Sequence, residues 1–457
     1  MKIAPEIFKA YDIRGVVGRT LTAEVATAIG RALGSEARAR GQNAIVIGRD
    51  GRLSGPMLVE ALAQGIRQAG CDVVDIGMAP TGAVYFAGFH LGVPSTVAVT
   101  GSHNPPDYNG FKMVLAGETL AGDAIQRLKQ RIENDDFTAG HGAYSRAEIL
   151  DAYLDRVTGD IHAARPLKLV IDCGNGVAGA LAPRLFRRLG CEVTGLFCEV
   201  DGTFPNHHPD PSQPENLEDL IRAVKTHGAD LGFAFDGDGD RLGVVTSEGA
   251  VIWPDRQLIL FAREILKRHP GAEFIYDVKC SRNLPKAIEA AGGKATMWRT
   301  GHSFIKAKLK ESGAALAGEM SGHLFFKDRW YGFDDGLYAG ARLIELLSND
   351  PRPPVEVFHE LPDSVNTPEL RIEFAEGEHF RAMKQLTECA RFPGARVSTV
   401  DGLRADYVDG FGLVRASNTT PILVLRFEGE NPQALKRIQD EFRALIRATR
   451  PEAVVPF

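Results

Sequence analysis

The chain has 457 residues, 44% of them apolar, and a formal net charge of −6. A chain of this length is too large for one hydrophobic core, so about two to four domains are expected. Positive and negative residues are interspersed rather than gathered in blocks. This pattern argues against a nucleic-acid groove or a basic membrane-binding face and favours a small-molecule partner.

The cysteines and the N-terminal segment bear on the cellular compartment in which the protein is expected. The six cysteines are scattered without a CxxC pair, as in proteins of a reducing compartment where thiols stay free. Residues 1–6 do not form an apolar signal segment, and no run of about 18 apolar residues occurs. We therefore expect a cytoplasmic protein without a disulfide scaffold.

One pattern recurs three times: an apolar strand, a turn with glycine or polar residues, a helical stretch, and a second strand after a glycine-containing break. The copies span residues 44–74, 169–193 and 274–296. Strands that alternate with helices favour mixed or parallel sheets covered by helices, with ligands at the strand ends. After about residue 362 the pattern changes to extended segments and one amphipathic helix at 432–449.

The predicted fold is therefore α/β, with three related βαβ-type domains of mixed sheets and a smaller C-terminal α+β domain. A proline-rich segment at 351–354 lies near the last boundary. The predicted domains are residues 1–148, 149–250, 251–362 and 363–457.

The first motif is the run 100–106, directly after the apolar strand 96–99. A chain reversal at a strand end would present the hydroxyl of Ser102 to solvent, where it could carry a phosphoryl group. Gly101 would remove side-chain bulk beside it, and His103 would be close enough to donate hydrogen bonds. A plain turn rich in Ser, Asn and Pro explains the same residues equally well.

The second motif alternates aspartate with glycine between two apolar strands, at Asp236, Asp238 and Asp240. The glycines let the backbone curl, so the three carboxylates can converge on one hard cation such as Mg²⁺. A calcium-binding hand loop needs Gly at its sixth position and Glu at its twelfth, where this chain has Arg241 and Ser247. A solvated acidic turn is the remaining alternative.

The third motif is a polar cluster between two apolar segments, with Glu319, Ser321 and His323. A carboxylate and a hydroxyl two positions apart can bind neighbouring sugar hydroxyls, and an imidazole can move a proton near neutral pH. A bulged turn whose polar groups satisfy the backbone is the alternative.

The fourth motif lies in the stretch 411–425, which has no acidic residue. Arg415 offers a planar fork of donors, and Ser417, Asn418 and Thr419 add neutral donors. Together these groups suit a phosphate dianion better than they suit a plain hairpin turn.

Together the four motifs favour a mutase over a phosphatase, because a separate phosphate site and a sugar-reading cluster require a substrate with both groups. A phosphoserine would donate to the hydroxyl at one end of a sugar phosphate and form a bisphosphate. The bisphosphate would turn over and return its other phosphoryl group to Ser102, which completes an isomerisation. Arg14, Lys112 and Arg241 are candidate cations beside the transferring group.

These motifs resemble those of the α-D-phosphohexomutase family, in particular its bacterial phosphomannomutase/phosphoglucomutase branch. The similar segments extend over nearly the whole chain, at residues 10–15, 100–112, 236–241, 318–323 and 415–420. The resemblance implies a heart-shaped molecule of four domains around a central cleft, with one motif from each domain. It also implies reversible transfer of a phosphoryl group between C6 and C1 of mannose and glucose phosphates.

The resemblance further implies that Ser102 is a phosphoserine and that Mg²⁺ is held by the three aspartates with the Ser102 group. A hexose 1,6-bisphosphate is the implied intermediate and activator. The candidate catalytic residues are Ser102, His103, Arg14, Lys112 and His323. The candidate substrate contacts are Tyr11, Arg241, Lys279, His302, Glu319, Ser321, His323, Arg415, Ser417, Asn418 and Thr419. His323 and Lys112 are alternative general bases, and a lysine base would need a depressed pKa.

The sugar specificity is expected to be dual. Glu319 and Ser321 would read the C3 and C4 hydroxyls, which glucose and mannose share. Met320 resembles the glucose and mannose enzymes, whereas the related glucosamine mutases usually have Gln there. The alternatives are a phosphoglucosamine mutase, a hydrolase, or a sugar-phosphate binding protein without turnover.

The remaining expectations concern partners and motion. Small sugar phosphates are the expected partners, with no nucleic acid and no membrane, and the chain is expected to be a monomer. The fourth domain is expected to move as a hinged unit, because one site must hold substrate, reoriented bisphosphate and product. The implied pathway is nucleotide-sugar synthesis.

Overall fold

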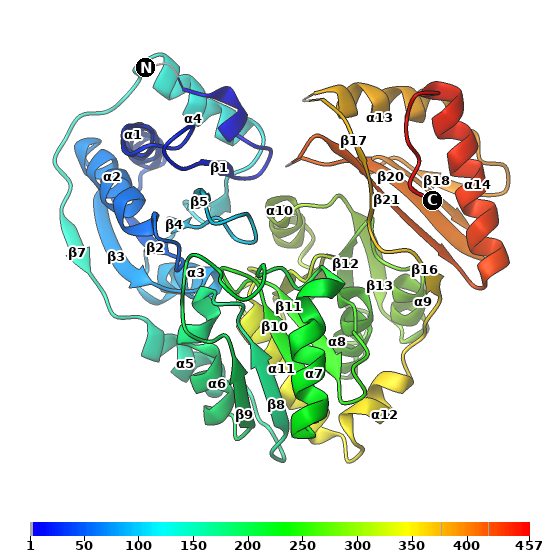
Figure 1. Cartoon of the computed structure of the whole chain (residues 1–457). Coiled ribbons are helices and arrows are strands. Elements are labelled where there is room, and N and C mark those ends of the chain that lie inside the picture. The colour runs from blue at the N-terminus through cyan, green and yellow to red at the C-terminus, as the bar shows by residue number, and fades with distance from the viewer. Residues whose placement is uncertain (1–2, 376, 419) are drawn as a thin grey trace. The chain divides into compact units, whose positions relative to one another are not determined.

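The computed structural model describes residues 3–375, 377–418 and 420–457. It divides into two compact units, in each of which helices flank β-sheets (Figure 1). The first unit contains the residues up to Gln257 together with His302–Glu360. The second contains Leu258–Gly301 and Leu361–Phe457.

A mixed sheet of seven strands begins the first unit. Its strands are β1 (Ile13–Val16), β2 (Ala44–Arg49), β3 (Asp72–Met78), β4 (Thr96–Val99), β5 (Tyr108–Leu115), β6 (Glu118–Thr119) and β7 (Tyr144–Arg146). The order is β1-β5-β4-β2-β3-β7, with β6 paired to β5. Strand β2 is parallel to β3 and β4, whereas β5 is antiparallel to β1 and β4.

Helices cover this sheet, and their apolar faces form its core. They are α1 (Ala23–Ala39), α2 (Gly55–Gln68), α3 (Thr81–His90) and α4 (Asp123–Glu133), with the short 3-10 helix η1 (Pro5–Ile7). Helix α5 (Leu150–Thr158) follows β7 and contacts α3. Helices α1 and α2 touch through small residues: a Cβ atom on Gly30 would lie 2.2 Å from the Leu62 carbonyl oxygen. The close contact therefore depends on glycine at that position.

A second, four-stranded sheet of the first unit carries the aspartate loop. Its strands are β8 (Lys168–Asp172), β9 (Glu192–Leu196), β10 (Leu231–Phe235) and β11 (Leu242–Thr246), in the order β11-β10-β8-β9. The associated helices are η2 (Val177–Ala180), α6 (Ala182–Arg188), η3 (Pro214–Leu217), α7 (Glu218–His227), α11 (Gly336–Asn349) and α12 (Pro354–His359). Strands β10 and β11 are antiparallel neighbours, so the loop between them is a hairpin connection.

The first unit also contains the helix α10 (His302–Ser312) and the antiparallel pair β14 (Leu316–Gly318) and β15 (Leu324–Phe326). The chain passes from the first unit to the second within α8 (Pro254–Arg268). The loop between β14 and β15 holds the third motif of the sequence.

The second unit contains a parallel pair of strands and an antiparallel sheet. The pair is β12 (Glu273–Asp277) and β13 (Lys294–Trp298), joined by α9 (Asn283–Ala290). The sheet consists of β16 (Val365–Asn366), β17 (Leu370–Glu373), β18 (Arg396–Ser398), β19 (Leu403–Tyr407), β20 (Gly410–Ala416) and β21 (Ile422–Gly429). Its order is β16-β21-β20-β19-β18, and β17 pairs with β21. Helices α13 (Glu378–Cys389) and α14 (Pro432–Thr449) pack on the sheet over an apolar core (Figure 1).

The predicted repeats are confirmed as β2 to β3, β8 to β9 and β12 to β13, and the predicted C-terminal helix is α14. The mixed sheets and the α+β arrangement near the C-terminus also agree with the predicted fold class. The domain boundaries given above stay predictions. Among the described helices, none has both the length and the apolar character needed to cross a bilayer.

Candidate active site

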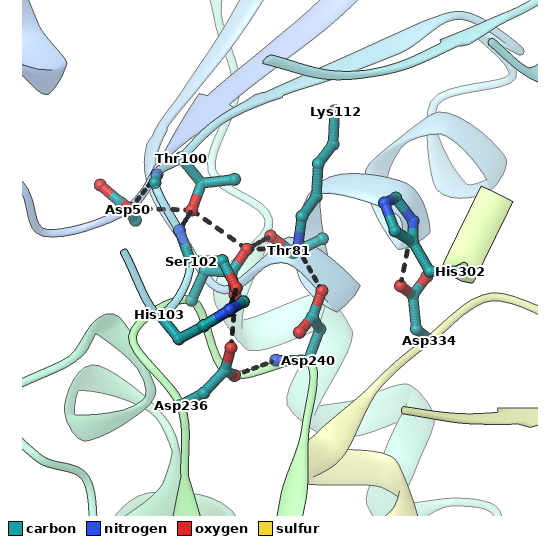
Figure 2. Close-up of polar contacts among 12 residues, drawn as sticks. Asp50, Thr81, Thr100, Ser102, His103, Lys112, Asp236, Asp240, His302 and Asp334 are labelled. Atoms are coloured by element: carbon teal, nitrogen blue, oxygen red, sulfur yellow. Dashed lines mark hydrogen bonds and ion pairs between the residues drawn. The ribbon is translucent and has the colours of Figure 1, made fainter. Parts of the chain in front are cut away.

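The serine loop connects β4 to β5. Ser102 has a φ of +47°, a left-handed conformation that is uncommon for a residue with a side chain. Its Oγ donates to Asp236 Oδ2 at 2.9 Å and lies 3.2 Å from His103 Nδ1, as Figure 2 shows. The prediction that Ser102 faces solvent is wrong, because the side chain is 1% exposed. The aspartate loop covers it: a Cβ atom on Gly237 would lie 2.4 Å from the Ser102 carbonyl oxygen.

Two residues that the sequence analysis missed hold the serine loop. Asp50 and Arg52 lie in the turn after β2, and both are buried. Asp50 Oδ2 accepts from the Thr100 hydroxyl at 2.8 Å and from the Gly101 N–H at 3.1 Å. Arg52 donates to the carbonyl oxygen of Ser102 at 2.8 Å. The available signal was a charged turn at the end of a parallel strand, where ligand sites gather.

The three aspartates of the β10–β11 loop converge. Asp236, Asp238 and Asp240 are fully buried, and their candidate ligand atoms lie within 4.8 Å of one another. Burial, together with the Asp240 and Asp238 carboxylates, raises the pKa of Asp236 well above its ordinary value. Because three buried carboxylates repel each other, this arrangement is suited to a cation, and oxygen ligands suit Mg²⁺.

Cationic side chains partly neutralise the aspartates. The Lys112 ammonium on β5 donates to Asp238 Oδ2 at 2.8 Å and also contacts Asp240 (Figure 2). Burial opposes the charge on Lys112, but these two carboxylates outweigh it and raise its pKa. The depressed pKa that a lysine base requires is therefore absent in this arrangement. Arg241 lies 3.7 Å from Asp236.

Arg14 joins the serine loop from β1. Its guanidinium forms an ion pair with Asp12 and donates to the side chain of Asn104, which lies two residues after Ser102. Thr81, at the start of α3, donates to Asp238 Oδ2 at 2.7 Å. Thr81 was not predicted from the sequence, and no local pattern distinguishes it.

The sugar motif lies beside the aspartate loop. His323 Nε2 is 3.3 Å from Asp240 Oδ1, and its Nδ1 is 2.9 Å from the Ser321 hydroxyl and 3.2 Å from Glu319. Burial opposes a charged imidazole, but Asp240 outweighs it and raises the pKa of His323 to about 9. The structure thus brings the second and third motifs together, as Arg241 and His323 also form a backbone bridge.

His302 and Tyr11 lie near the same cluster. The His302 ring is 5.2 Å from the Tyr11 ring and 5.8 Å from the His323 ring, between centroids. Both ring nitrogens are buried without a hydrogen-bond partner among the described residues, and Asp334 lies 3.6 Å away (Figure 2). Burial, followed by the positive charge of Lys306, lowers the pKa of His302 well below its ordinary value. A buried neutral imidazole with free nitrogens can bind a polar ligand.

The fourth motif lies in the second unit. Arg415, at the end of β20, donates from Nε to Asp401 Oδ2 at 2.9 Å. The stretch 411–425 has no acidic residue, so this acidic partner comes from another part of the chain. The Lys279 ammonium lies 2.6 Å from Glu369 Oε1. Burial opposes the charge on Lys279, but the carboxylates of Glu369 and Asp277 together outweigh it and raise the pKa of Lys279, whereas the positive charge of Arg415 acts to lower it. Lys279 and Arg415 thus lie in the same unit, and each is paired with a carboxylate.

The neutral donors of the fourth motif are placed in part. Ser417 is buried, and its Oγ accepts from the Thr420 N–H at 3.3 Å. Asn418 is half-buried next to it. Thr419, predicted as a further donor, lies outside the described residues.

Comparisons with known proteins identify the family of the chain. Four models match the chain: phosphoglucomutase/phosphomannomutase alpha/beta/alpha domain I at residues 5–139, domain II at 151–249, domain III at 253–365, and the C-terminal domain at 369–445. The phosphomannomutase/phosphoglucomutase of Pseudomonas aeruginosa is 56% identical over 99% of this chain and 97% of its own length. A phosphoglucomutase of Neisseria meningitidis serogroup A is 54% identical over 99% of both chains.

The solved structures agree as well. A phosphoglucomutase/phosphomannomutase family protein from Burkholderia thailandensis has a TM-score of 0.95 and 58% identity, with 100% of both chains covered. A putative phosphomannomutase from Thermus thermophilus, at 23% identity and a TM-score of 0.82, shares the fold. The four-domain α/β fold and the resemblance inferred from the motifs are confirmed. The chain therefore belongs to the phosphoglucomutase/phosphomannomutase family.

Proposed function

We propose that the protein interconverts the 1-phosphates and 6-phosphates of mannose and glucose, as an isomerase of the intramolecular phosphotransferase class. The observation that carries the proposal is the hydroxyl of Ser102, which lies 2.9 Å from one of three converging buried carboxylates. The Pseudomonas relative is named for both sugars and the Neisseria relative for glucose, which supports this reaction over the glucosamine and binding-protein alternatives.

The aspartate loop fits a magnesium ion. One of its oxygens, Asp238 Oδ1, is buried without a hydrogen-bond partner among the described residues, and another, Asp240 Oδ1, has only His323 Nε2 at 3.3 Å. Asp236, Asp238 and Asp240 would hold the ion, with an oxygen of the Ser102 group as a further ligand. Bound Mg²⁺ would neutralise charge on the transferring phosphoryl group.

Ser102 would act as the phosphoryl carrier. The bond between its Oγ and phosphorus breaks, a bond from phosphorus to a sugar hydroxyl oxygen forms, and the hydroxyl proton passes to a base. The resulting hexose 1,6-bisphosphate turns over and returns its other phosphoryl group to Ser102. The serine is regenerated in phosphorylated form, and added bisphosphate would activate any protein that has lost this group.

The side chains around Ser102 would divide the electrostatic and proton-transfer roles. Lys112, Arg14 and Arg241 are cations that can balance the charge of the phosphoryl group. His103 would donate to the Ser102 group, since its Nδ1 lies 3.2 Å from Oγ. His323 remains the candidate for exchange of the hydroxyl proton, because the raised pKa of Lys112 keeps the lysine charged and leaves it the role of balancing charge.

The protein would bind both the sugar hydroxyls and the phosphate of the substrate. Glu319 and Ser321 would bind the C3 and C4 hydroxyls, which explains activity on both glucose and mannose. The other proposed contacts are Tyr11, Arg241, Lys279, His302, His323, Arg415, Ser417, Asn418 and Thr419. Within this set, the basic pair Lys279 and Arg415 would bind the phosphate that is not transferred.

The broader expectations stay proposals. They are four domains at residues 1–148, 149–250, 251–362 and 363–457, a monomeric state, a cytoplasmic location, and a role in nucleotide-sugar synthesis. The length of the chain is compatible with several domains.

The test is a coupled assay with mannose 1-phosphate and glucose 1-phosphate, Mg²⁺ and a trace of glucose 1,6-bisphosphate. Turnover of both sugars that collapses in Ser102→Ala supports the proposal. Absence of turnover of either sugar would contradict it, and glucosamine 1-phosphate would then be assayed. Release of inorganic phosphate at the turnover rate would indicate a hydrolase instead.

A further inference from the structure

Arg52 makes an unusual set of contacts with the backbone of the serine loop. Its side chain is fully buried, and one nitrogen, Nη2, donates to the carbonyl oxygens of Ser102 at 2.8 Å and Asn104 at 2.6 Å. The other, Nη1, donates to the carbonyl oxygen of Tyr108 at 2.9 Å and to that of Pro105. A planar guanidinium with a fixed fork of donors can serve four acceptors at once, which an ammonium group cannot do in this geometry.

These contacts provide hydrogen-bond donors for carbonyl oxygens of the loop. The serine loop reverses direction within a few residues, and Ser102 adopts a positive φ of +47°. Among the described residues, no backbone N–H donates to the carbonyl oxygens of Ser102 and Asn104, whereas that of Pro105 accepts from the Tyr108 N–H at 3.0 Å. Because Ser102 is buried, its carbonyl oxygen requires a donor, and the guanidinium supplies it. The hydrogen bonds from Arg52 therefore hold the backbone of the loop in this conformation.

The turn that contains Arg52 also provides an acceptor for a backbone N–H group of the serine loop. Asp50, two residues before Arg52, accepts from the Gly101 N–H at 3.1 Å and from the Thr100 hydroxyl at 2.8 Å. The Thr100 hydroxyl oxygen in turn accepts from the Ser102 N–H at 2.8 Å. Asp50 and Arg52 are linked by an ion pair of 3.3 Å, so one short turn positions both faces of the nucleophile loop.

Gly101 explains how the guanidinium reaches these carbonyl groups. A Cβ atom at this position would lie 2.4 Å from Arg52 Nε and 2.5 Å from its Cζ. Any side chain at residue 101 would displace the guanidinium, and Gly101 is not among the residues with positive φ. The glycine of the serine motif is therefore required by the space around Arg52 and around the Tyr108 carbonyl oxygen, which would lie 2.8 Å from such a Cβ atom, rather than by its own backbone conformation.

We propose that Arg52 is a positioning residue for the reaction, which fixes the serine loop so that Ser102 Oγ faces the aspartate loop. The proposal rests on the proposed mutase function. In this structure the guanidinium contacts the backbone of the loop and not Oγ itself, so its effect is on placement of the nucleophile. Substrate binding, which involves other side chains, is unaffected.

The first test compares Arg52→Lys with the wild type in the coupled assay. Lysine keeps the charge but cannot serve all the carbonyl groups, so the loop shifts, kcat falls about 100-fold and KM is unchanged. Arg342→Lys is the matched control, since Arg342 is equally buried and binds both oxygens of Asp328 at 2.8 and 2.9 Å. It should lower the unfolding temperature without changing kcat.

A double-mutant cycle with Gly101→Ala tests directly whether Arg52 holds the shape of the serine loop. In the wild-type background the alanine methyl group meets the guanidinium, and kcat should fall by a similar factor. In an Arg52→Ala background the same substitution should cost less, because the guanidinium is gone and only the Tyr108 carbonyl oxygen, 2.8 Å from the added Cβ atom, stays close. Coupling of this sign would not arise from a general loss of stability.

Several outcomes would overturn the proposal. Unchanged kcat in Arg52→Lys, a rise in KM instead, or additive effects in the cycle would each contradict it. Unfolding of Arg52→Lys at the assay temperature would also do so, because Arg52 would then serve overall stability. If the wild type lacks mutase activity, the proposed function fails. If the wild type and Ser102→Ala behave as proposed while Arg52→Lys keeps full kcat, only this inference fails.

Discussion

Ser102 Oγ donates a hydrogen bond of 2.9 Å to Asp236 Oδ2. This contact joins the β4–β5 loop to the β10–β11 loop, which are 134 residues apart in the chain. A phosphoryl group on Ser102 would therefore be attached directly beside the three aspartates and the Lys112 ammonium. The predictions below follow from this arrangement and from the groups that support it.

The first prediction concerns how far the three buried aspartates lower the stability of the protein in the absence of a metal ion. Replacement of Asp236 by Asn removes one of three mutually repelling buried charges, so Asp236→Asn should unfold at a higher temperature than the wild type in EDTA. The wild type should gain stability with Mg²⁺, by about 2.7 kcal/mol when the ion is at 100 times its Kd. The variant should gain little and should lose mutase activity.

Thermal unfolding with and without Mg²⁺ measures both effects. Asp151→Asn is a suitable control, because Asp151 is an exposed aspartate whose replacement should leave the Mg²⁺ response intact. An equal Mg²⁺ shift in wild type and Asp236→Asn would show that the ion binds elsewhere.

The second prediction concerns the phosphate cluster of the second unit. Arg415→Lys keeps the charge but loses the planar fork, so KM for the sugar phosphates should rise while kcat changes little. A loss of one charge-assisted pair corresponds to about 1.5 to 3 kcal/mol, or roughly a 10- to 100-fold change in KM. Arg371→Lys, at an exposed position of the same sheet, should leave KM unchanged. A fall in kcat at constant KM would assign Arg415 to another role.

The third prediction is a pH dependence of stability that is separate from the aspartate loop. Burial raises the pKa of Asp335 to about 7, although its carboxylate accepts from the Tyr338 N–H and the Tyr153 hydroxyl. The folded protein therefore holds a proton that the unfolded chain releases above about pH 4. This contribution to stability is complete below about pH 4 and is lost as the pH rises through about 7.

Asp335→Asn isolates this contribution. Asparagine keeps the oxygen that caps α11 but does not titrate, so the difference in unfolding temperature between wild type and variant should change between about pH 4 and pH 7. Over this range the wild type should lose stability relative to the variant, and above about pH 8 the difference should be constant. A difference that is flat across the whole range would contradict the raised pKa.

The elements that the sequence predicted well are those set by local patterns. The convergence of Asp236, Asp238 and Asp240 in one loop follows from the alternating glycines and the flanking apolar strands, which define a tight hairpin connection. The repeats were found because strand and helix periods alternate over short distances. The serine motif was located for the same reason, at the end of an apolar strand.

Other features depend on contacts between distant segments. The burial of Ser102 results from the approach of Gly237, which no pattern near Ser102 indicates. The link between Asp334 and His302, at 3.6 Å, joins the start of α10 to the segment before α11. Asp401 beside Arg415 likewise comes from another strand connection. Such contacts arise from packing, so sequence periodicity alone does not predict them.

The most direct test of the central claim is to locate the phosphoryl group. The protein is incubated with glucose 1,6-bisphosphate and Mg²⁺, and its intact mass and peptide fragments are measured beside those of Ser102→Ala. Our account predicts one phosphoryl group on the wild type, located at Ser102, and none on the variant, which also lacks turnover. Phosphorylation of another residue, or full turnover by Ser102→Ala, would contradict it.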